Sequence, residues 1–381
     1  MAQSNLIKIN LTHRLFLLAS LILTGCSINV AQTSSFDSAG GHGGDQNSSN
    51  TKVPVAWKDL GLQGRLVYVN SALSFEQTGL SNATALQILD LENGNVQTIF
   101  QAPDKAWIDF VSASPDGKQL AIEYVPSNKD ALAVNPGQQT IYIMPSEASQ
   151  PPMPLVHPLS GGDVYQQPIW SPDGKYIYFV HSNYQSPFTM PNQVFPVYEI
   201  FRMKYPGGPP EKLIDKAFWP KLSMDGSLLV YVSFNPVDGS NRLFVATADG
   251  SNQHQIPLSG SYIPTVIDAP SFSLDNKVIY FSAATPPKSF SMNLIDRLFG
   301  VTVASAHVVK SDWWSVPVDG GTITQLTHIS TVGMFGEISP DYKHVALHTG
   351  SGLLAMNLDG TGLTVLVKDV GGSQGSVSWM P

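Results

Sequence analysis

The sequence predicts an all-β fold, a six-bladed β-propeller of four-stranded antiparallel blades. One observation is a turn phrase, Ser-Pro-Asp-Gly or a close variant, that recurs along the chain and precedes a strand-forming run in most copies. Another is a second turn, Asn-Gly, Gly-Gly or Asp-Gly, that joins two strands later in each repeat. Four antiparallel strands in about 50 residues make one propeller blade.

The turn phrase has the residues of a tight turn. Proline presets φ at the first central position, and Asp followed by Gly or Asn tolerates the positive φ that reverses the chain. Runs of β-branched and aromatic residues, which favour strands, follow most copies. The copies begin at Ser114, Ser171, Ser223, Ser273 and Ser339. We therefore expect a strand on either side of each copy.

A second pair of strands follows downstream in each repeat and has its own hairpin turn. These pairs begin at Ala85, Tyr198, Arg242, Trp313 and Gly352. One further strand, such as residues 167–170, leads into the next turn phrase. Each repeat therefore contains four strands.

The two ends of the repeated region each carry part of one more repeat. Residues 64–69 look like a second strand with no turn phrase before it, and residues 375–381 look like an innermost strand that stops before its Asp-Gly. Five whole phrases and one split phrase give six blades, closed by pairing of the C-terminal strand with the N-terminal blade. Closure removes an open sheet edge and two wet apolar faces. The irregular stretch 283–310 leaves a ring of five or seven blades as the alternative.

The turn phrase and the later Asp-Gly hairpin resemble the TolB-type propeller repeat, over residues 64–381. This resemblance implies that the phrase joins the innermost and second strands of a blade and that the later turn joins the third and outermost strands. It also implies an extracytoplasmic protein with a partner in the cell envelope. The family's periplasmic member has an extra N-terminal domain where this chain has a polar segment.

The N-terminus has the pattern of an export signal. Residues 1–14 carry Lys8, His13 and Arg14 and no acid, and residues 15–24 form an apolar run. As a helix this run rises only ~15 Å, about half of a bilayer core, which is too short for a lasting span. Residues 23–26, Leu-Thr-Gly-Cys, resemble the lipobox of bacterial lipoproteins. We therefore expect a lipoprotein signal peptide at 1–25 and lipidation of Cys26.

Composition separates a tether from the propeller and excludes several classes of protein. Residues 26–52 are rich in Ser, Gly and Asn and predict a flexible tether, so the propeller is expected at 53–381. The 21 Lys and Arg against 29 Asp and Glu lack the basic excess that binding along nucleic acid requires. A single cysteine excludes an intramolecular disulfide framework.

The long connections are predicted to share one face, here called the loop face, opposite the turn face that carries the short turns. They are residues 70–84, 126–137, 182–196 and 283–310. Long ordered loops on a rigid scaffold commonly bind ligands. The candidate ligand-binding residues there are Tyr184, Phe188, Phe195, Phe290 and Phe299. Apolar residues at helical spacing also predict a short helix at 289–299, which docks a partner, contacts the membrane or caps the ring.

The search for catalytic and metal-binding patterns yields one candidate residue and no site. Residues 371–375 match Gly-x-Ser-x-Gly, but the strand before Ser373 and the helix after it that a nucleophile elbow needs are not predicted. Histidine spacings fit no zinc motif, and the turn role explains the repeated aspartates without calcium. Glu337, on an innermost strand, is the sixth candidate ligand-binding residue and the carboxylate to consider at the axis. We predict no catalytic residue, no cofactor and no metal.

The sequence favours a membrane-anchored extracytoplasmic propeller that acts as a non-catalytic binding or scaffold module for a protein or cell-envelope ligand. Its expected partners are the membrane, through the lipid anchor, and an envelope protein or glycan. The alternative is a propeller enzyme of the polysaccharide lyase, glycan hydrolase or cyclotransferase type with its site at the central pocket. Carboxylates or histidines converging on the axis would favour that alternative.

Overall fold

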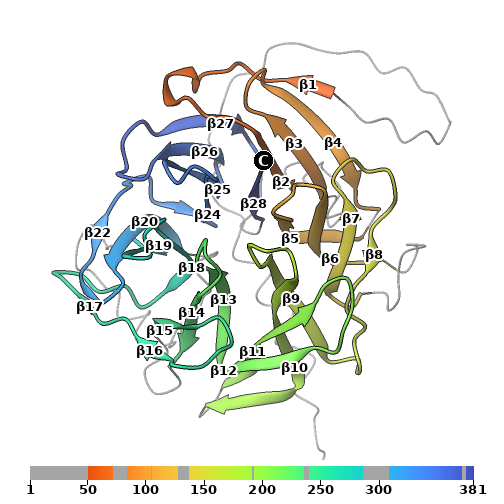
Figure 1. Ribbon diagram of the computed structural model, residues 1–381, viewed down its shortest axis with the longest axis vertical. Helices are drawn as coiled ribbons and strands as arrows, with labels where there is room; N and C mark the ends of the chain where they lie inside the picture. The colour runs from red at the N-terminus through yellow and green to blue at the C-terminus, as the bar shows by residue number, and fades with distance from the viewer. Residues whose placement is uncertain are drawn as a thin grey trace, which may run out of the picture. The chain divides into compact units, whose positions relative to one another are not determined.

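The computed structural model describes residues 50–71, 84–103, 105–127, 137–190, 193–235, 240–285, 309–370 and 375–381. For Asn50 and for residues 184–190 and 193–196 it describes the backbone alone. The described residues form six antiparallel blades around an axis (Figure 1). The predicted all-β, six-bladed propeller is confirmed.

In every blade the strands are ordered outward from the axis. Blade 1 comprises β28 (Val377–Met380), β2 (Arg65–Asn70), β3 (Ala85–Asp90), β4 (Asn95–Gln101) and β1 (Asn50–Lys52). Blade 2 comprises β5 (Trp107–Ala113), β6 (Gln119–Val125), β7 (Thr140–Pro145) and β8 (Met153–Pro154). Blade 3 comprises β9 (Asp163–Trp170), β10 (Tyr176–Met190), β11 (Gln193–Lys204) and β12 (Glu211–Asp215).

The second half of the ring follows the same plan. Blade 4 comprises β13 (Ala217–Leu222), β14 (Leu228–Phe234), β15 (Asn241–Thr247) and β16 (His254–Gln255). Blade 5 comprises β18 (Ile267–Phe272), β19 (Val278–Ala284), β20 (Lys310–Pro317) and β22 (Thr324–Gln325), and β23 (Thr331–Val332) also pairs with β20. Blade 6 comprises β24 (Phe335–Ile338), β25 (His344–Thr349), β26 (Gly352–Asn357) and β27 (Thr364–Lys368). A parallel pair, β17 (Leu258–Ser259) with β21 (Gly321–Thr322), links the chain after blade 4 to blade 5, and the 3₁₀ helix η1 spans Lys58–Leu60.

The turn phrases join innermost to second strands, and one hydrogen-bonding pattern fixes all five. The serine hydroxyl donates to the aspartate at 2.6–2.7 Å in each copy. In the first copy the Ser114 hydroxyl oxygen accepts the backbone N–H of Gln119, where β6 begins. These bonds account for the repeated aspartates within the turns, and the serine bond to Asp173 is the main cause that lowers the pKa of this carboxyl to about 2.

The ring closes as the split repeat predicts. β28 pairs antiparallel with β2, and the register sets Arg65 opposite Met380 and Tyr68 opposite Val377. Serine hydroxyls of the C-terminal segment also reach the next blade, because Ser376 Oγ accepts the N–H of Val111. A strand that the sequence did not predict, β1, covers the outer edge of β4 in the last residues of the expected tether. Such pairing satisfies backbone groups of an otherwise open edge.

A buried histidine joins blade 6 to blade 1 at the closure. His348 on β25 is 0% exposed, and its Nε2–H donates to the Val69 carbonyl oxygen at 2.8 Å. Its Nδ1 has no hydrogen-bond partner among the described residues. Burial lowers the pKa of His348 to about 4, against the opposing effect of the bond to Val69.

We expect this histidine to make the propeller less stable in acid. Between pH 6.5 and pH 4, His348 binds a proton in the unfolded chain but not in the folded chain. The free energy of unfolding therefore falls as the pH falls, by up to about 3 kcal/mol. Urea denaturation at pH 7 and pH 4 measures this slope. The control is His348→Gln, whose amide can donate to Val69 without titrating. An equal pH slope in both proteins would contradict the role of His348.

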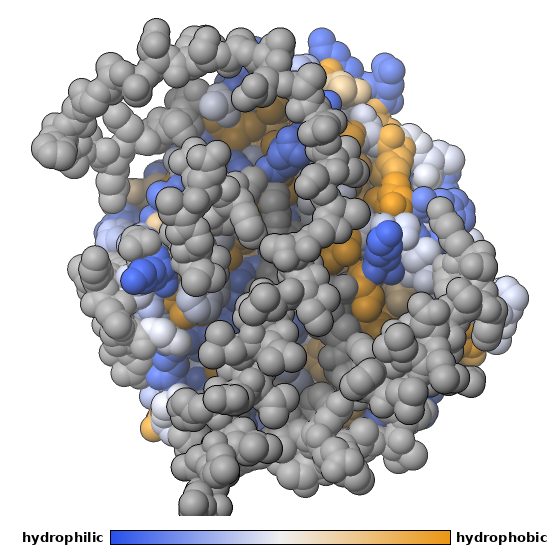
Figure 2. All heavy atoms as spheres, turned by 180° about the vertical axis from the view of Figure 1, so that it is seen from behind, coloured by the Kyte–Doolittle hydropathy of each residue, from blue (hydrophilic) through white to orange (hydrophobic). Residues whose placement is uncertain are grey.

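Among the described residues, no helix combines the length and the apolar character required to cross a bilayer. On the face turned away in Figure 1, the coloured surface intersperses hydrophilic and hydrophobic residues (Figure 2).

Candidate functional site

The axis is lined by the six innermost strands and is nearly filled. Its cavity volume is 20 Å³, which is room for about one water molecule. Two layers of side chains fill it, and each layer takes residues from equivalent positions of the repeats. The layer four residues before the turn-phrase serines comprises Phe110, Gln167, Trp219, Ala269 and Phe335. The layer two residues before them comprises Ser112, Ile169, Lys221, Ser271 and Glu337.

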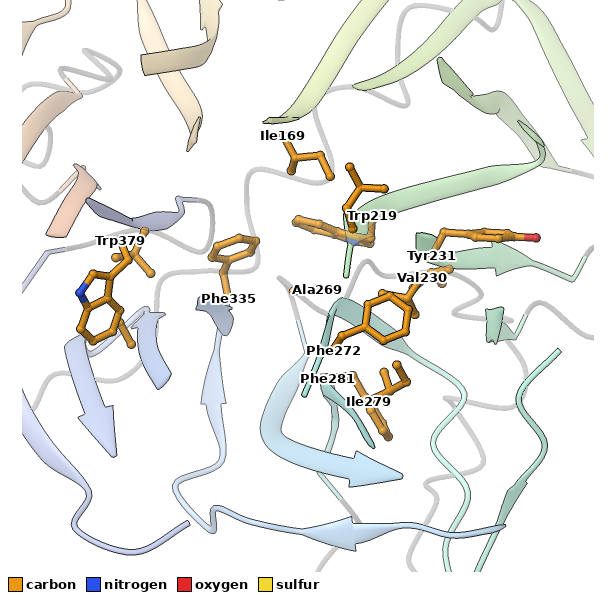
Figure 3. Close-up of a cluster of buried hydrophobic side chains, with 14 of the residues drawn as sticks. Ile169, Trp219, Val230, Tyr231, Ala269, Phe272, Ile279, Phe281, Phe335 and Trp379 are labelled. Atoms are coloured by element: carbon orange, nitrogen blue, oxygen red, sulfur yellow. The ribbon is translucent and has the colours of Figure 1, made fainter. Parts of the chain in front are cut away.

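Three aromatic rings from alternate blades close the first layer, and they are called the aromatic plug here. Phe110 packs edge to face on Phe335 with ring centroids 5.0 Å apart. Trp219 lies 6.0 Å from Phe110 and 5.8 Å from Phe335. Figure 3 shows Trp219 and Phe335 projecting into a common space beside Ile169 and Ala269. The plug leaves no room for a substrate at this level of the axis.

Glu337 lies at the axis, as its place on an innermost strand predicts, but another side chain holds it. Lys221 Nζ of blade 4 donates to both Glu337 carboxylate oxygens of blade 6, at 2.7 and 2.6 Å. Sequence reasoning missed Lys221. The signal was present, because Lys221 and Glu337 both stand two residues before the serine of a turn phrase.

A groove of 880 Å³ lies between blades 2 and 3. Because each turn phrase follows its innermost strand, the beginnings of β5 and β9 lie at the loop face, and these beginnings form part of the groove. Its lining includes Trp107, Gln138, Gln139, Leu159, Ser160 and Asp163. Leu159 at its lip is 93% exposed. The groove is open to solvent and is lined by both polar and apolar residues, in contrast to the filled axis.

Asp163 holds the loop at the edge of the groove. Its Oδ2 accepts the backbone N–H groups of Leu159 and Ser160 at 3.1 and 2.7 Å. Gln138 Nε2 donates to the carbonyl oxygens of Ser160 and Asp163 at 2.6 and 2.9 Å. These bonds fix the backbone of the lip, so the groove is preformed.

Behind the lip, an imidazole bridges two carboxylates. His181 Nε2 lies 3.0 Å from Asp163 Oδ1, and Nδ1 lies 3.3 Å from Glu199 Oε2. Burial raises the pKa of Asp163, but hydrogen bonds, led by that of His181, outweigh burial and hold it below its usual value. Asp163 and Glu199 lie on opposite sides of the imidazole ring and do not converge on one point. No group of three or more His, Cys, Asp or Glu side chains in the described part of the chain could hold a metal ion.

Bulges in the innermost strands place the residues of the first layer. In β9 the register shifts opposite Phe179, and Gln167 has φ 53°. In β13 the shift occurs opposite Tyr231, and Trp219 has φ 54°. A bulge adds a residue and re-aims the side chains beside it. Gln167 thereby reaches the next blade, where its Oε1 accepts the Trp219 backbone N–H at 2.8 Å.

The prediction of a loop at 182–196 is wrong. β10 and β11 extend through most of it as one long hairpin, in which Phe188 is paired with Phe195, with a register irregularity between Asn183 and Pro187. The segment was predicted as a long connection between strands, but backbone pairing continues into it, with Pro187 opposite Pro196. Tyr184 lies on β10, and the side chains of all three aromatic residues are outside the described structure. Cys26, Phe290, Phe299, Ser373 and the expected helix at 289–299 also lie outside the described residues.

The propeller is similar in fold to solved structures. TolB from Acinetobacter baumannii matches with a TM-score of 0.55 and 19% identity, over 84% of this chain and 67% of that chain. Putative TolB from Agrobacterium tumefaciens matches with a TM-score of 0.51 and 15% identity, over 84% of this chain and 100% of that chain. A nidogen/laminin complex structure matches with a TM-score of 0.52 and 10% identity, over 82% of this chain and 97% of that chain.

These likenesses establish the fold, a TolB-like six-bladed β-propeller, as the turn phrases predict. No protein-family model matches the chain, and no curated protein matches its sequence.

Proposed function

We propose that this chain is a lipid-anchored, extracytoplasmic propeller that binds a protein of the cell envelope at its loop face without catalysis. The observation that carries the proposal is the contrast between the two recesses. The axis has a cavity volume of 20 Å³, whereas the groove between blades 2 and 3 has 880 Å³. A rigid, preformed groove on the loop face suits the docking of a partner segment.

The central-pocket enzyme has less support from the geometry. An active site needs space for the substrate and a free acid or base beside it. The aromatic plug fills that space, and both oxygens of Glu337 are engaged by Lys221. The groove therefore suits binding better than the axis suits catalysis.

Membrane anchoring rests on the sequence before the propeller. The basic and apolar residues of 1–24 and the Leu-Thr-Gly-Cys motif favour export and lipidation at Cys26. Two or more acyl chains hold a protein stably on a bilayer. Extracytoplasmic location also agrees with the fold shared with TolB.

We expect a photoreactive amino acid at Leu159 to crosslink the full chain to a discrete protein in intact envelopes. Leu159 is the most exposed apolar side chain of the groove lip, so a docked partner would contact it. Mass spectrometry of the crosslinked band identifies the partner.

The matched control places the same group at Met224, which is 50% exposed and lies in a turn phrase on the turn face. Equal crosslinking at both positions, or none at Leu159, would argue against the groove. Retention and slow cleavage of envelope glycan without a crosslinked protein would favour the enzyme instead.

Cys26→Ala should move the chain to the soluble fraction, and its persistence in the membrane would contradict the anchor.

A further inference from the structure

Two carboxyl groups, those of Asp109 and Glu123, accept hydrogen bonds from the same side-chain amide between the groove and the axis. Asp109 is the extra residue of the bulge in β5, and the next residue, Phe110, is paired with Glu123 of β6. Glu123 is 4% exposed. Gln139 lines the groove, and its side-chain amide donates to Asp109 Oδ2 at 3.4 Å and also to Glu123 Oε1. Trp107 Nε1 adds a bond to Asp109 Oδ2 at 3.1 Å.

Among the described residues, no positive charge pairs with either acid. The strands packed against β5 and β6 carry other titratable groups, namely Arg65 and Tyr68 on β2, Asp90 on β3, Tyr142 on β7, and Asp163 and Tyr165 on β9. Lys221, which lines the axis, forms an ion pair with Glu337. No basic side chain among the described residues hydrogen-bonds to Asp109 or Glu123 or forms an ion pair with either.

A comparison with Asp312 shows what a purely structural buried carboxylate looks like in this fold. Asp312 is 0% exposed and accepts bonds from several donors. They are the hydroxyls of Thr285 and Thr327, the backbone N–H groups of Ile329 and Ser330, and Gln325 Nε2. Those donors engage both of its carboxylate oxygens. Glu123 has two donors and faces a second acid.

Asp109 is half-buried and Glu123 is buried, and two neighbouring like charges without a cation do not both ionise readily at moderate pH. Burial raises the pKa of Asp109, and burial together with the charge of Asp109 raises that of Glu123 well above its usual range. The pair therefore keeps one proton near neutral pH. Loss of that proton places two negative charges near each other.

Hydrogen bonds connect the pair to the aromatic plug. Glu123 Oε2 accepts the backbone N–H of Gln167 in blade 3 at 2.7 Å. Gln167 Oε1 in turn accepts the backbone N–H of Trp219 in blade 4. Both Gln167 and Trp219 have the positive φ of bulge residues, a conformation that side chains rarely adopt without support. Trp219 packs on Phe110 and Phe335 in the plug.

We propose that Asp109 and Glu123 form a proton-dependent latch that holds the bulge at Gln167 and thereby keeps the aromatic plug closed. With one of the two acids protonated, the bond from Gln167 to Glu123 is kept and blades 2, 3 and 4 are tied together. With both acids ionised, repulsion separates them, the bond to Gln167 breaks, and the bulge that positions Trp219 loosens. The latch thus couples the wall of the groove, through Gln139, to the closure of the axis.

Amide hydrogen exchange of the full chain tests this latch at the bonds that form it. Protection, corrected for the intrinsic pH dependence of exchange, is measured at the Gln167 and Trp219 amides between pH 6 and pH 9. Once the pair ionises, opening linked to the loss of one proton should lower protection by about tenfold per pH unit. Amides of β15, which lie outside the hydrogen bonds that link Glu123, Gln167 and Trp219, should keep their protection, whereas a merely structural role would lower protection everywhere.

Two variants separate the latch from general stability. Glu123→Gln cannot ionise, and we expect both amides to stay protected at pH 9. Asp109→Asn leaves one charge, and we expect a smaller loss, which serves as the test if Glu123→Gln does not fold. Glu147→Gln, an exposed acid of blade 2, should behave as the wild type. Constant protection in the wild type, or an unchanged loss in the first two variants, would overturn the proposal.

Discussion

Removal of residues 376–381 should leave a chain that does not unfold cooperatively. The truncation deletes β28, the innermost strand of blade 1, in which Val377 and Met380 are fully buried and Trp379 nearly so. It exposes the inner edge of β2 and removes the hydroxyl bonds of Ser376 to Val111 and of Ser378 to Ala113. Because each blade buries its faces only against its neighbours, the defect spreads around the ring. Circular dichroism during a thermal scan measures the loss of the transition.

Removal of Pro381 alone is the matched control, because it leaves all of β28 in place and should preserve the transition. Addition of a peptide with the sequence of residues 375–381 should restore some folding by completing blade 1 in trans. A truncated chain that melts at the wild-type temperature would contradict the closure of the ring by β28.

The turn phrases made most of the fold predictable from the sequence. Each phrase marks the end of an innermost strand and the start of a second one, so register and order follow from the chemistry of one turn. The split phrase gave the closure because its two halves stand at opposite ends of the repeated region. β1 could not be found, because Asn-Thr-Lys has no apolar pattern that would mark its pairing with β4.

The candidate site was less predictable, for different reasons at different residues. The place of Glu337 on the axis followed from its innermost strand, and alignment of the five phrases would also have shown Lys221 and the three rings of the plug. Asp109 and Glu123 meet only because a bulge in β5 adds a residue. Bulges depend on the twist and the packing of neighbouring strands, which no local residue pattern specifies. The groove likewise needs two blades to be placed side by side.

Phe335→Ala should lower the free energy of unfolding by about 3–5 kcal/mol, the usual cost of deleting a large aromatic side chain from a core. Phe335 is 6% exposed and packs on both other rings of the plug, so its removal leaves a cavity on the axis that its neighbours on rigid strands cannot refill. Urea denaturation measures the difference. Val365→Ala, on β27 of the same blade and 39% exposed, is the control and should cost less than about 1 kcal/mol.

The same variant distinguishes a structural plug from a functional axis. If the groove binds the partner, Phe335→Ala should retain crosslinking at Leu159 under conditions where it stays folded, because the plug does not line the groove. A variant as stable as the wild type would contradict a packed plug. Loss of crosslinking in a folded Phe335→Ala protein would move the binding site from the groove to the axis, where an opened channel changes what the propeller can hold.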